Sequence, residues 1–320
     1  MNTILSHTTA LTFWLSGAYR TVDLDWPSMP PAMPGGYVNF AELPDCLKGL
    51  AADAPKIHVL GSASRCWAEG RCHACNIELP SRSIARVRSG ALSGLCICGP
   101  ELSLAQSAGI LSLPQLLRAA YKLCGSYDTD RRNRRIGSVT NVRKIGEMIR
   151  RLPNMRGIQK ARTALRYMLD NSWSERESML AIHCILPYRL GGYGLPKPVL
   201  NYKVGLNNLE KRTSGKNYLV IDMYWPDREY GIEYDSNKHH THCRQIDNDS
   251  RRSGVLMHKG IEKVSITTGM FDDFVQFDKT ARMIGRDLGK RVNPRDEDHL
   301  LKVIDLRLQM QAEIPDNIWM

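Results

Sequence analysis

Two acidic residues, Asp222 and Glu233, interrupt runs of large apolar residues that are predicted β-strands. A turn at Pro226 lies between the runs, so the two side chains should face each other across an antiparallel hairpin. Facing carboxylates repel each other unless a cation lies between them, and Mg²⁺ and Mn²⁺ prefer such oxygen ligands. The pattern predicts a site for Mg²⁺ or Mn²⁺ in which Asp222 bridges, Glu233 is the second ligand and the Tyr234 carbonyl is the third.

The alternative is that these acids lie on the solvent-facing side of an amphipathic hairpin. Two observations favour the metal site. Asp is depleted in strand interiors, and a third acid, Asp235, shares the face of Glu233 and precedes a stretch rich in His and Asp. A metal ion in such a site activates water and positions a phosphate, so the predicted chemistry is phosphodiester hydrolysis.

Other residues near these acids have candidate roles, each with a structural alternative. Glu177, at the start of a predicted helix, would orient a metal-bound water, or it is an acid stabilised by the helix dipole. His239 would act as a general acid or base, or it makes a structural hydrogen bond. Arg251 and Arg252 would hold a phosphate, or they lie on a solvated helix face.

Positive charge is concentrated in one segment. The net charge is +11, and residues 131–166 contain twelve Lys or Arg and one acid, Glu147, so the rest of the chain is neutral in sum. Such a segment predicts a polyanionic partner, most simply DNA, although a solvated helical surface is the alternative. The residues expected to contact nucleic acid here are Arg131, Arg132, Arg134 and Arg135.

Hydrophobic periodicity predicts an α+β protein. Residues 1–130 should form a mixed α+β module, residues 131–171 a basic helical connector, and residues 172–320 a second domain with C-terminal helices. The second domain has the order α-β-β-β-α-β. Its predicted elements are a helix over 174–186, strands over 199–206, 218–225 and 229–235, a helix over 245–259, a strand over 262–267 and a helix over 271–290.

Nine cysteines are scattered along the chain, as in a reduced cytoplasmic protein. Four of them form a C-x-x-C and a C-x-C pair that would suit a structural zinc ion. Their segments alternate like strands, so we expect half-buried strand residues rather than zinc ligands. We also expect no membrane span, and the sequence identifies no protein partner. The four cysteines are Cys72, Cys75, Cys96 and Cys98, with Cys66 and His73 nearby.

Motifs of the second half occur in a fixed order over residues 174–267. They are a Ser-x-x-Glu helix start, a Gly-Leu-Pro-x-Pro loop, a strand Asp followed by Trp-Pro, and a Glu-x-Asp strand end, followed by an Asp/Arg-rich helix, Leu-x-x-x-Gly and a last strand. This set resembles the PD-(D/E)XK nuclease superfamily, in particular very-short-patch repair endonucleases and the C-terminal domain of AbiEi-type antitoxin-like proteins. The residues that carry it are Ser174, Glu177, Gly194, Leu195, Pro196, Pro198, Asp222, Trp225, Pro226, Glu233, Asp235, His239, Asp249, Arg252, Leu256 and Gly260.

The resemblance implies a restriction-endonuclease-like core and a metal-dependent DNA endonuclease of defence or repair. Two departures bear on that expectation: Ser236 replaces the Gly of the subfamily, and Asp235 occupies the position of the Lys of the wider class. Lys238, His239 or His240 would have to replace that Lys. Otherwise the domain is a DNA-binding regulator or antitoxin-like protein that keeps the fold without cleaving.

Overall fold

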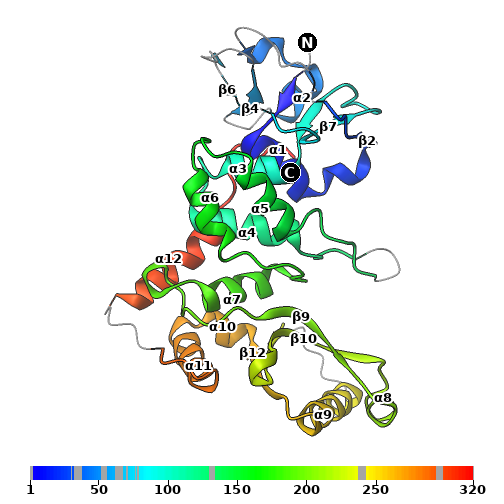
Figure 1. The fold of residues 1–320 in the computed structure, drawn as a ribbon, viewed down its shortest axis with the longest axis vertical. Coiled ribbons are helices and arrows are strands. Elements are labelled where there is room, and N and C mark those ends of the chain that lie inside the picture. The colour runs from blue at the N-terminus through cyan, green and yellow to red at the C-terminus, as the bar shows by residue number, and fades with distance from the viewer. Residues whose placement is uncertain are drawn as a thin grey trace. The chain divides into compact units, whose positions relative to one another are not determined.

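The chain forms two compact units, which are interleaved along the sequence. The first contains residues 1–124, 137–168 and 311–320, and the second contains residues 125–136 and 169–310. The division differs from the predicted three parts, because the helices of the basic connector and the C-terminal residues belong to the first unit. The computed structural model (Figure 1) describes residues 3–29, 31, 38–51, 56–61, 68–69, 71–75, 77, 79–129, 134–236, 243–292 and 298–319.

A mixed six-stranded sheet lies in the first unit, with the order β2-β7-β8-β1-β4-β6. Over residues 56–98 its strands are short and separated by Gly and Ser, as the sequence pattern there predicts, and all residues of β4 and β8 are buried. A separate two-stranded sheet pairs β3 with β5. The strands are β1 (Ile4–Leu5), β2 (Leu24–Asp25), β3 (Val38–Asn39), β4 (Ile57–Leu60), β5 (Ala68–Glu69), β6 (Cys72–Cys75), β7 (Ile84–Val87) and β8 (Cys96–Cys98).

Helices of the first unit surround α3, whose residues are almost all buried and which packs against α1 and α5. The basic helices α5 and α6 are amphipathic: Ile145 and Ile149 are buried, whereas Lys144 and Arg150 are exposed. The helices are α1 (His7–Ser16), η1 (Ala18–Thr21), η2 (Phe40–Glu42), α2 (Asp45–Leu50), α3 (Pro100–Ser107), α4 (Leu113–Cys124), α5 (Val142–Arg150) and α6 (Ile158–Leu165).

A four-stranded sheet with the order β12-β11-β10-β9 forms the centre of the second unit. Strands β9, β10 and β11 are antiparallel neighbours, and β12 runs parallel to β11. Parallel neighbours need a long crossover, and α9 provides it. Val255 and Leu256 of α9 pack with Leu219 and Ile221 of β10. The strands are β9 (Val199–Gly205), β10 (Tyr218–Trp225), β11 (Tyr230–Asp235) and β12 (Glu262–Thr267).

Helices of the second unit follow the predicted α-β-β-β-α-β order, with two differences. An unpredicted helix, α8, follows β9 and begins with a capping box between Asn207 and Glu210. The helix predicted over 271–290 is two helices, because Asp273 caps the second by accepting from the amides of Val275 and Gln276. The helices are α7 (Glu175–Ile185), η3 (Tyr188–Leu190), α8 (Asn208–Ser214), η4 (Pro226–Arg228), α9 (Cys243–His258), α10 (Thr268–Asp272), α11 (Phe274–Asp287) and α12 (His299–Gln311).

The α+β class predicted from the sequence is confirmed by these two mixed sheets and their helices. Across the described ranges, none of the helices is both long enough and apolar enough to span a membrane.

Candidate functional site

The hairpin of β10 and β11 brings the predicted acids toward each other. Its ladder ends with the pair Met223 and Ile232, and Asp222 and Glu233 are the next residues of the two strands. At these residues the regular ladder is replaced by a side-chain hydrogen bond, in which the Tyr234 amide donates to Asp222 Oδ2 at 2.7 Å. The predicted hairpin is therefore confirmed, and Asp222 is held in place by its partner strand.

Asp222 lies in an acidic environment. Burial, and then the negative charges of Glu177 and Glu233, raise the pKa of its carboxyl from 3.8 to about 7. The Tyr234 amide and the Arg252 guanidinium act in the opposite direction without offsetting this rise. Asp222 thus holds its proton close to neutral pH, and a cation at this point would relieve the same repulsion.

Of the two roles considered for Glu177, the structure shows the one at the helix start. Its amide donates to Ser174 Oγ at 3.1 Å, and its Oε1 accepts from the same hydroxyl at 2.9 Å, as at a capped helix start. Its Oε2 accepts from the Trp173 amide and from Asn201 Nδ2, each at 3.0 Å. These four contacts fix the carboxylate at the N-terminus of α7, where it acts electrostatically on Asp222.

Asn201 is a site residue that sequence analysis missed. Its side chain is buried, with 2% exposed, and its φ is 47°. Asn201 lies across from Asp222 between two regular pairs of the β9–β10 ladder, but the two residues do not themselves form a ladder pair. Its Nδ2 donates to Glu177 Oε2 at 3.0 Å and to the Asn171 carbonyl at 2.9 Å. Its buried Oδ1 has no hydrogen-bond partner within the described part of the chain. The available signal was an Asn inside an apolar strand.

Glu233 is compensated by two cations. Lys263 Nζ lies 2.8 Å from Oε2, and Arg252 forms an ion pair with Oε1 while also donating to the Val220 carbonyl. Lys263 was not predicted as a site residue. The parallel register pairs it with Gly231 of β11. Glu233 is two residues further along β11, so its side chain lies on the same side of the sheet and within reach of Lys263. Arg252, predicted to hold a phosphate, is bound to the acidic site itself.

A cavity of about 480 Å³ adjoins the site, and Asp222 and Arg252 both line it. A small molecule or a nucleotide segment therefore has access to the Asp222 side chain. The remaining lining residues are Trp173, Gly215, Lys216, Asn217, Tyr218, Leu219 and Val220.

Arg135, one of the predicted nucleic-acid contacts, makes internal contacts. Its Nη1 donates to the carbonyls of Ser126 and Trp173 at 3.0 and 2.8 Å, and its guanidinium lies 4.6 Å from the centre of the Trp173 ring. These contacts hold the segment before α7 against the edge of the cavity.

The other predicted residues fall into three groups. Asp235, Arg134 and Arg251 are exposed, and Asp235 ends β11 in register with Thr267. The cysteines of the C-x-x-C and C-x-C pairs lie on β6 and β8, with β4 and β1 between them in the sheet order. The predicted residues that lie outside the described ranges are Arg131, Arg132, Lys238, His239, His240 and Cys66.

Comparisons of this chain with protein-family models, with curated proteins and with solved structures found no match. A functional assignment therefore depends on the geometry and chemistry of the site.

Proposed function

We propose that the second unit is a Mg²⁺- or Mn²⁺-dependent endonuclease that hydrolyses DNA phosphodiester bonds at Asp222. The observation that carries this proposal is the environment of that carboxyl: it is half-buried, close to two other acids, and beside a cavity. Uncompensated acidic groups of this kind are common at sites that bind a cation or move a proton.

The donor atoms fit a hard divalent ion. Asp222 supplies a carboxylate, and the buried Asn201 Oδ1 is an oxygen acceptor that has no hydrogen-bond partner among the described residues. Both are oxygen ligands of the kind that Mg²⁺ and Mn²⁺ select. When bound, such an ion would polarise the phosphate and lower the pKa of a water molecule.

Lys263 would replace the Lys that the wider nuclease class carries two residues after its Glu. Its ammonium reaches Glu233 from the neighbouring strand, and Arg252 reaches the same carboxylate from α9. Two cations at the edge of an acidic site can bind a phosphate oxygen and stabilise the negative charge that develops on it. In this proposal Lys263 performs the role expected of Lys238, His239 or His240.

A non-cleaving DNA-binding protein is the second candidate. The ion pairs of Glu233 favour it, because Lys263 and Arg252 already neutralise one predicted metal ligand without an ion. In that case the acids and cations would stabilise the domain, and DNA would be bound by the basic helices of the first unit.

Cleavage of supercoiled and linear DNA by the full chain, with Mg²⁺, with Mn²⁺ and with EDTA, tests the first candidate. Wild type should cleave with either metal and not with EDTA. Asp222→Asn and Glu233→Gln should each lower the rate at least about a hundredfold, since changes even to outer-shell groups of metal sites cost 10–100-fold.

Asp227→Asn is the matched control, because Asp227 is exposed on the turn of the same hairpin. It should cleave like wild type. Cleavage by Asp222→Asn at the wild-type rate would remove Asp222 from the mechanism. DNA binding by wild type without cleavage in either metal would establish the second candidate.

A further inference from the structure

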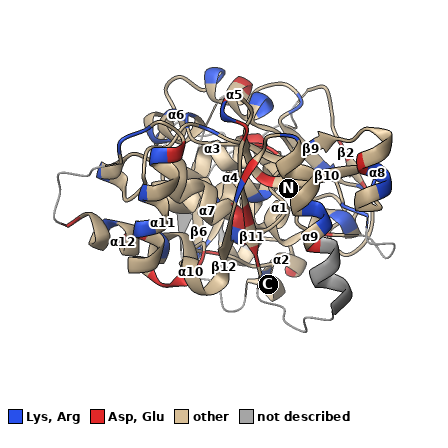
Figure 2. Ribbon diagram, turned by 90° about the horizontal axis from the view of Figure 1, so that it is seen from below, with Lys and Arg blue, Asp and Glu red and all other residues tan. Residues whose placement is uncertain are grey.

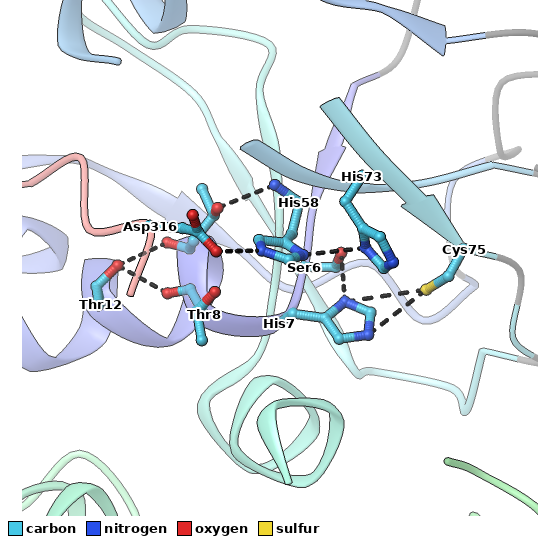
Figure 3. A network of polar contacts seen from close by, with 9 residues as sticks. Ser6, His7, Thr8, Thr12, His58, His73, Cys75 and Asp316 are labelled. Atoms are coloured by element: carbon cyan, nitrogen blue, oxygen red, sulfur yellow. Dashed lines mark hydrogen bonds and ion pairs between the residues drawn. The ribbon is translucent and has the colours of Figure 1, made fainter. Parts of the chain in front are cut away.

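Three histidines of the first unit converge on one point. One ring nitrogen from each of His7, His58 and His73 lies within 4.8 Å of the others. Figure 3 shows the three rings close together. Throughout the described residues, no other trio of His, Cys, Asp or Glu side chains converges in this way. The three rings come from α1, β4 and β6, so the fold assembles them from separate parts of the sequence.

The parallel pairing of β4 with β6 positions two of the rings. It sets His58 beside His73 in register, and their Nδ1 atoms lie 3.0 Å apart. His7 joins them at the start of α1 with a φ of 48°, a left-handed conformation that is uncommon outside glycine. The amide of Ser6 donates to the His58 carbonyl at 2.9 Å and holds the start of α1 beside β4.

Asp316 orients the central ring. Its Oδ2 lies 2.8 Å from His58 Nε2, and the two side chains are only 10% and 4% exposed. A carboxylate only accepts, so the proton of His58 is on Nε2 and the lone pair of Nδ1 points toward His73. Metal-binding histidines are commonly held in this way, by a carboxylate on the nitrogen that does not bind the ion.

Cys75 adds a fourth donor atom. Its Sγ lies 3.7 Å from His7 Nε2 and 3.9 Å from His7 Nδ1, and it follows His73 by two residues on β6. Around a tetrahedral Zn²⁺, neighbouring nitrogen ligands lie about 3.3 Å apart, and a nitrogen and a sulfur about 3.6 Å apart. The 3.0 Å between the Nδ1 atoms of His58 and His73 and the 3.7 Å between Cys75 Sγ and His7 Nε2 are close to these values, whereas the three ring nitrogens as a set lie within 4.8 Å of one another.

We propose that His7, His58, His73 and Cys75 bind a transition-metal ion of the zinc type, with Asp316 as the orienting carboxylate. This site differs from the four-cysteine cluster considered from the sequence, of which it uses only Cys75. A cavity of about 450 Å³ borders it and is lined by His7, His73 and Cys75, so the ion has access from solvent.

A metal-free arrangement is the competing interpretation. Asp316, His58 and His73 would then form a chain of hydrogen bonds, with a proton between the two Nδ1 atoms. The two interpretations differ in a measurable quantity, because only the first predicts one bound ion per chain.

Metal content after Zn²⁺ loading and gel filtration, measured by elemental analysis on the full chain, provides the test. Wild type should hold one Zn²⁺ per chain. His73→Gln should lose it, and Asp316→Asn should bind it about 10–100-fold more weakly. His258→Gln, a change to an exposed histidine of α9, should retain the wild-type content.

Co²⁺ substitution gives a second readout that does not depend on the stability of the histidine variants. Wild type should show the visible bands of tetrahedral Co²⁺ and a thiolate-to-metal charge-transfer band. Cys75→Ser should lose only the charge-transfer band, whereas Cys46→Ser should keep both. Wild type without stoichiometric metal, or His73→Gln with wild-type affinity, would overturn the proposal.

Discussion

Asp222 is an acid whose ionised form is costly in the folded chain. Burial and the nearby carboxylates of Glu177 and Glu233 favour the protonated form, and its pKa rises from 3.8 to about 7. Between these pH values the folded chain retains a proton that the unfolded chain has lost. Stability therefore falls as the pH rises from about 4 to about 7.

Replacing Asp222 by Asn should remove this pH dependence. The amide cannot ionise, and its Oδ1 can still accept from the Tyr234 amide. A pKa difference of about 3 corresponds to at most about 4 kcal/mol, so the variant should be more stable than wild type at pH 8 by up to that amount. Urea unfolding at pH 5 and pH 8 measures the difference.

Asp227→Asn should keep the wild-type pH dependence in the same experiment, because that carboxylate is exposed on the turn. Mg²⁺ should stabilise wild type at pH 8 and have little effect on Asp222→Asn. The same loss of stability between pH 5 and pH 8 in wild type and Asp222→Asn would show that Asp222 ionises normally.

The sequence pointed to Asp222 and Glu233 because each breaks an apolar run inside a strand. Asn201 and Lys263 gave a weaker signal, since their roles depend on the register of strands that the local pattern does not specify. The histidine cluster was missed for the same reason, because His58 meets His73 only through the parallel pairing of β4 with β6.

At the scale of elements, the geometry of the acidic site depends on the close approach of β10 and β11. Gly231 makes that approach possible, because a Cβ at its position would lie 2.7 Å from Ile221 Cγ2. Ile221 is fully buried, and its branched side chain is stiff. A side chain at position 231 would therefore displace one strand from the other beside Asp222.

Gly231→Ala should destabilise the second unit by about 1–3 kcal/mol, the usual cost of overpacking a filled core. Gly205→Ala is the matched control, because Gly205 lies in β9 of the same sheet and a Cβ there would have no atom within 4 Å. Thermal unfolding of both variants and wild type measures the effect. Equal unfolding temperatures for the two variants would contradict this account of the hairpin.

The periodicity of apolar residues was sufficient to predict most of these helices and strands. The elements that it did not predict have identifiable physical causes. Helix α8 follows β9 closely and has few apolar residues, so only its Asn207–Glu210 capping box marked it. The division between α10 and α11 results from a hydrogen bond of Asp273 that interrupts an otherwise continuous helical pattern. Local hydrogen bonds thus decided boundaries that the spacing of apolar residues left open.

At the scale of the whole molecule, charge and acidic chemistry belong to different units. The basic helices α5 and α6 are part of the first unit, and the acidic site is part of the second. Figure 2 shows Lys and Arg positions along α5, whose buried face is apolar. A surface of this kind binds DNA through phosphates, so its contribution should depend on salt and not on base sequence.

Lys144→Ala combined with Arg150→Ala tests that contribution, because both side chains are exposed on α5. Each phosphate contact contributes about 0.9 to the slope of log K against log salt concentration, so the double variant should reduce the slope by up to about 1.8. Fluorescence anisotropy with DNA duplexes of different sequence, over a range of salt concentrations, measures both the slope and any preference for base sequence.

The matched control is Lys279→Ala combined with Arg286→Ala, which changes two exposed cations of α11. This variant should leave the slope near that of wild type. An unchanged slope in the α5 variant would mean that its basic face is only solvated, and an equal reduction in both variants would mean that net charge, rather than this helix, determines the affinity.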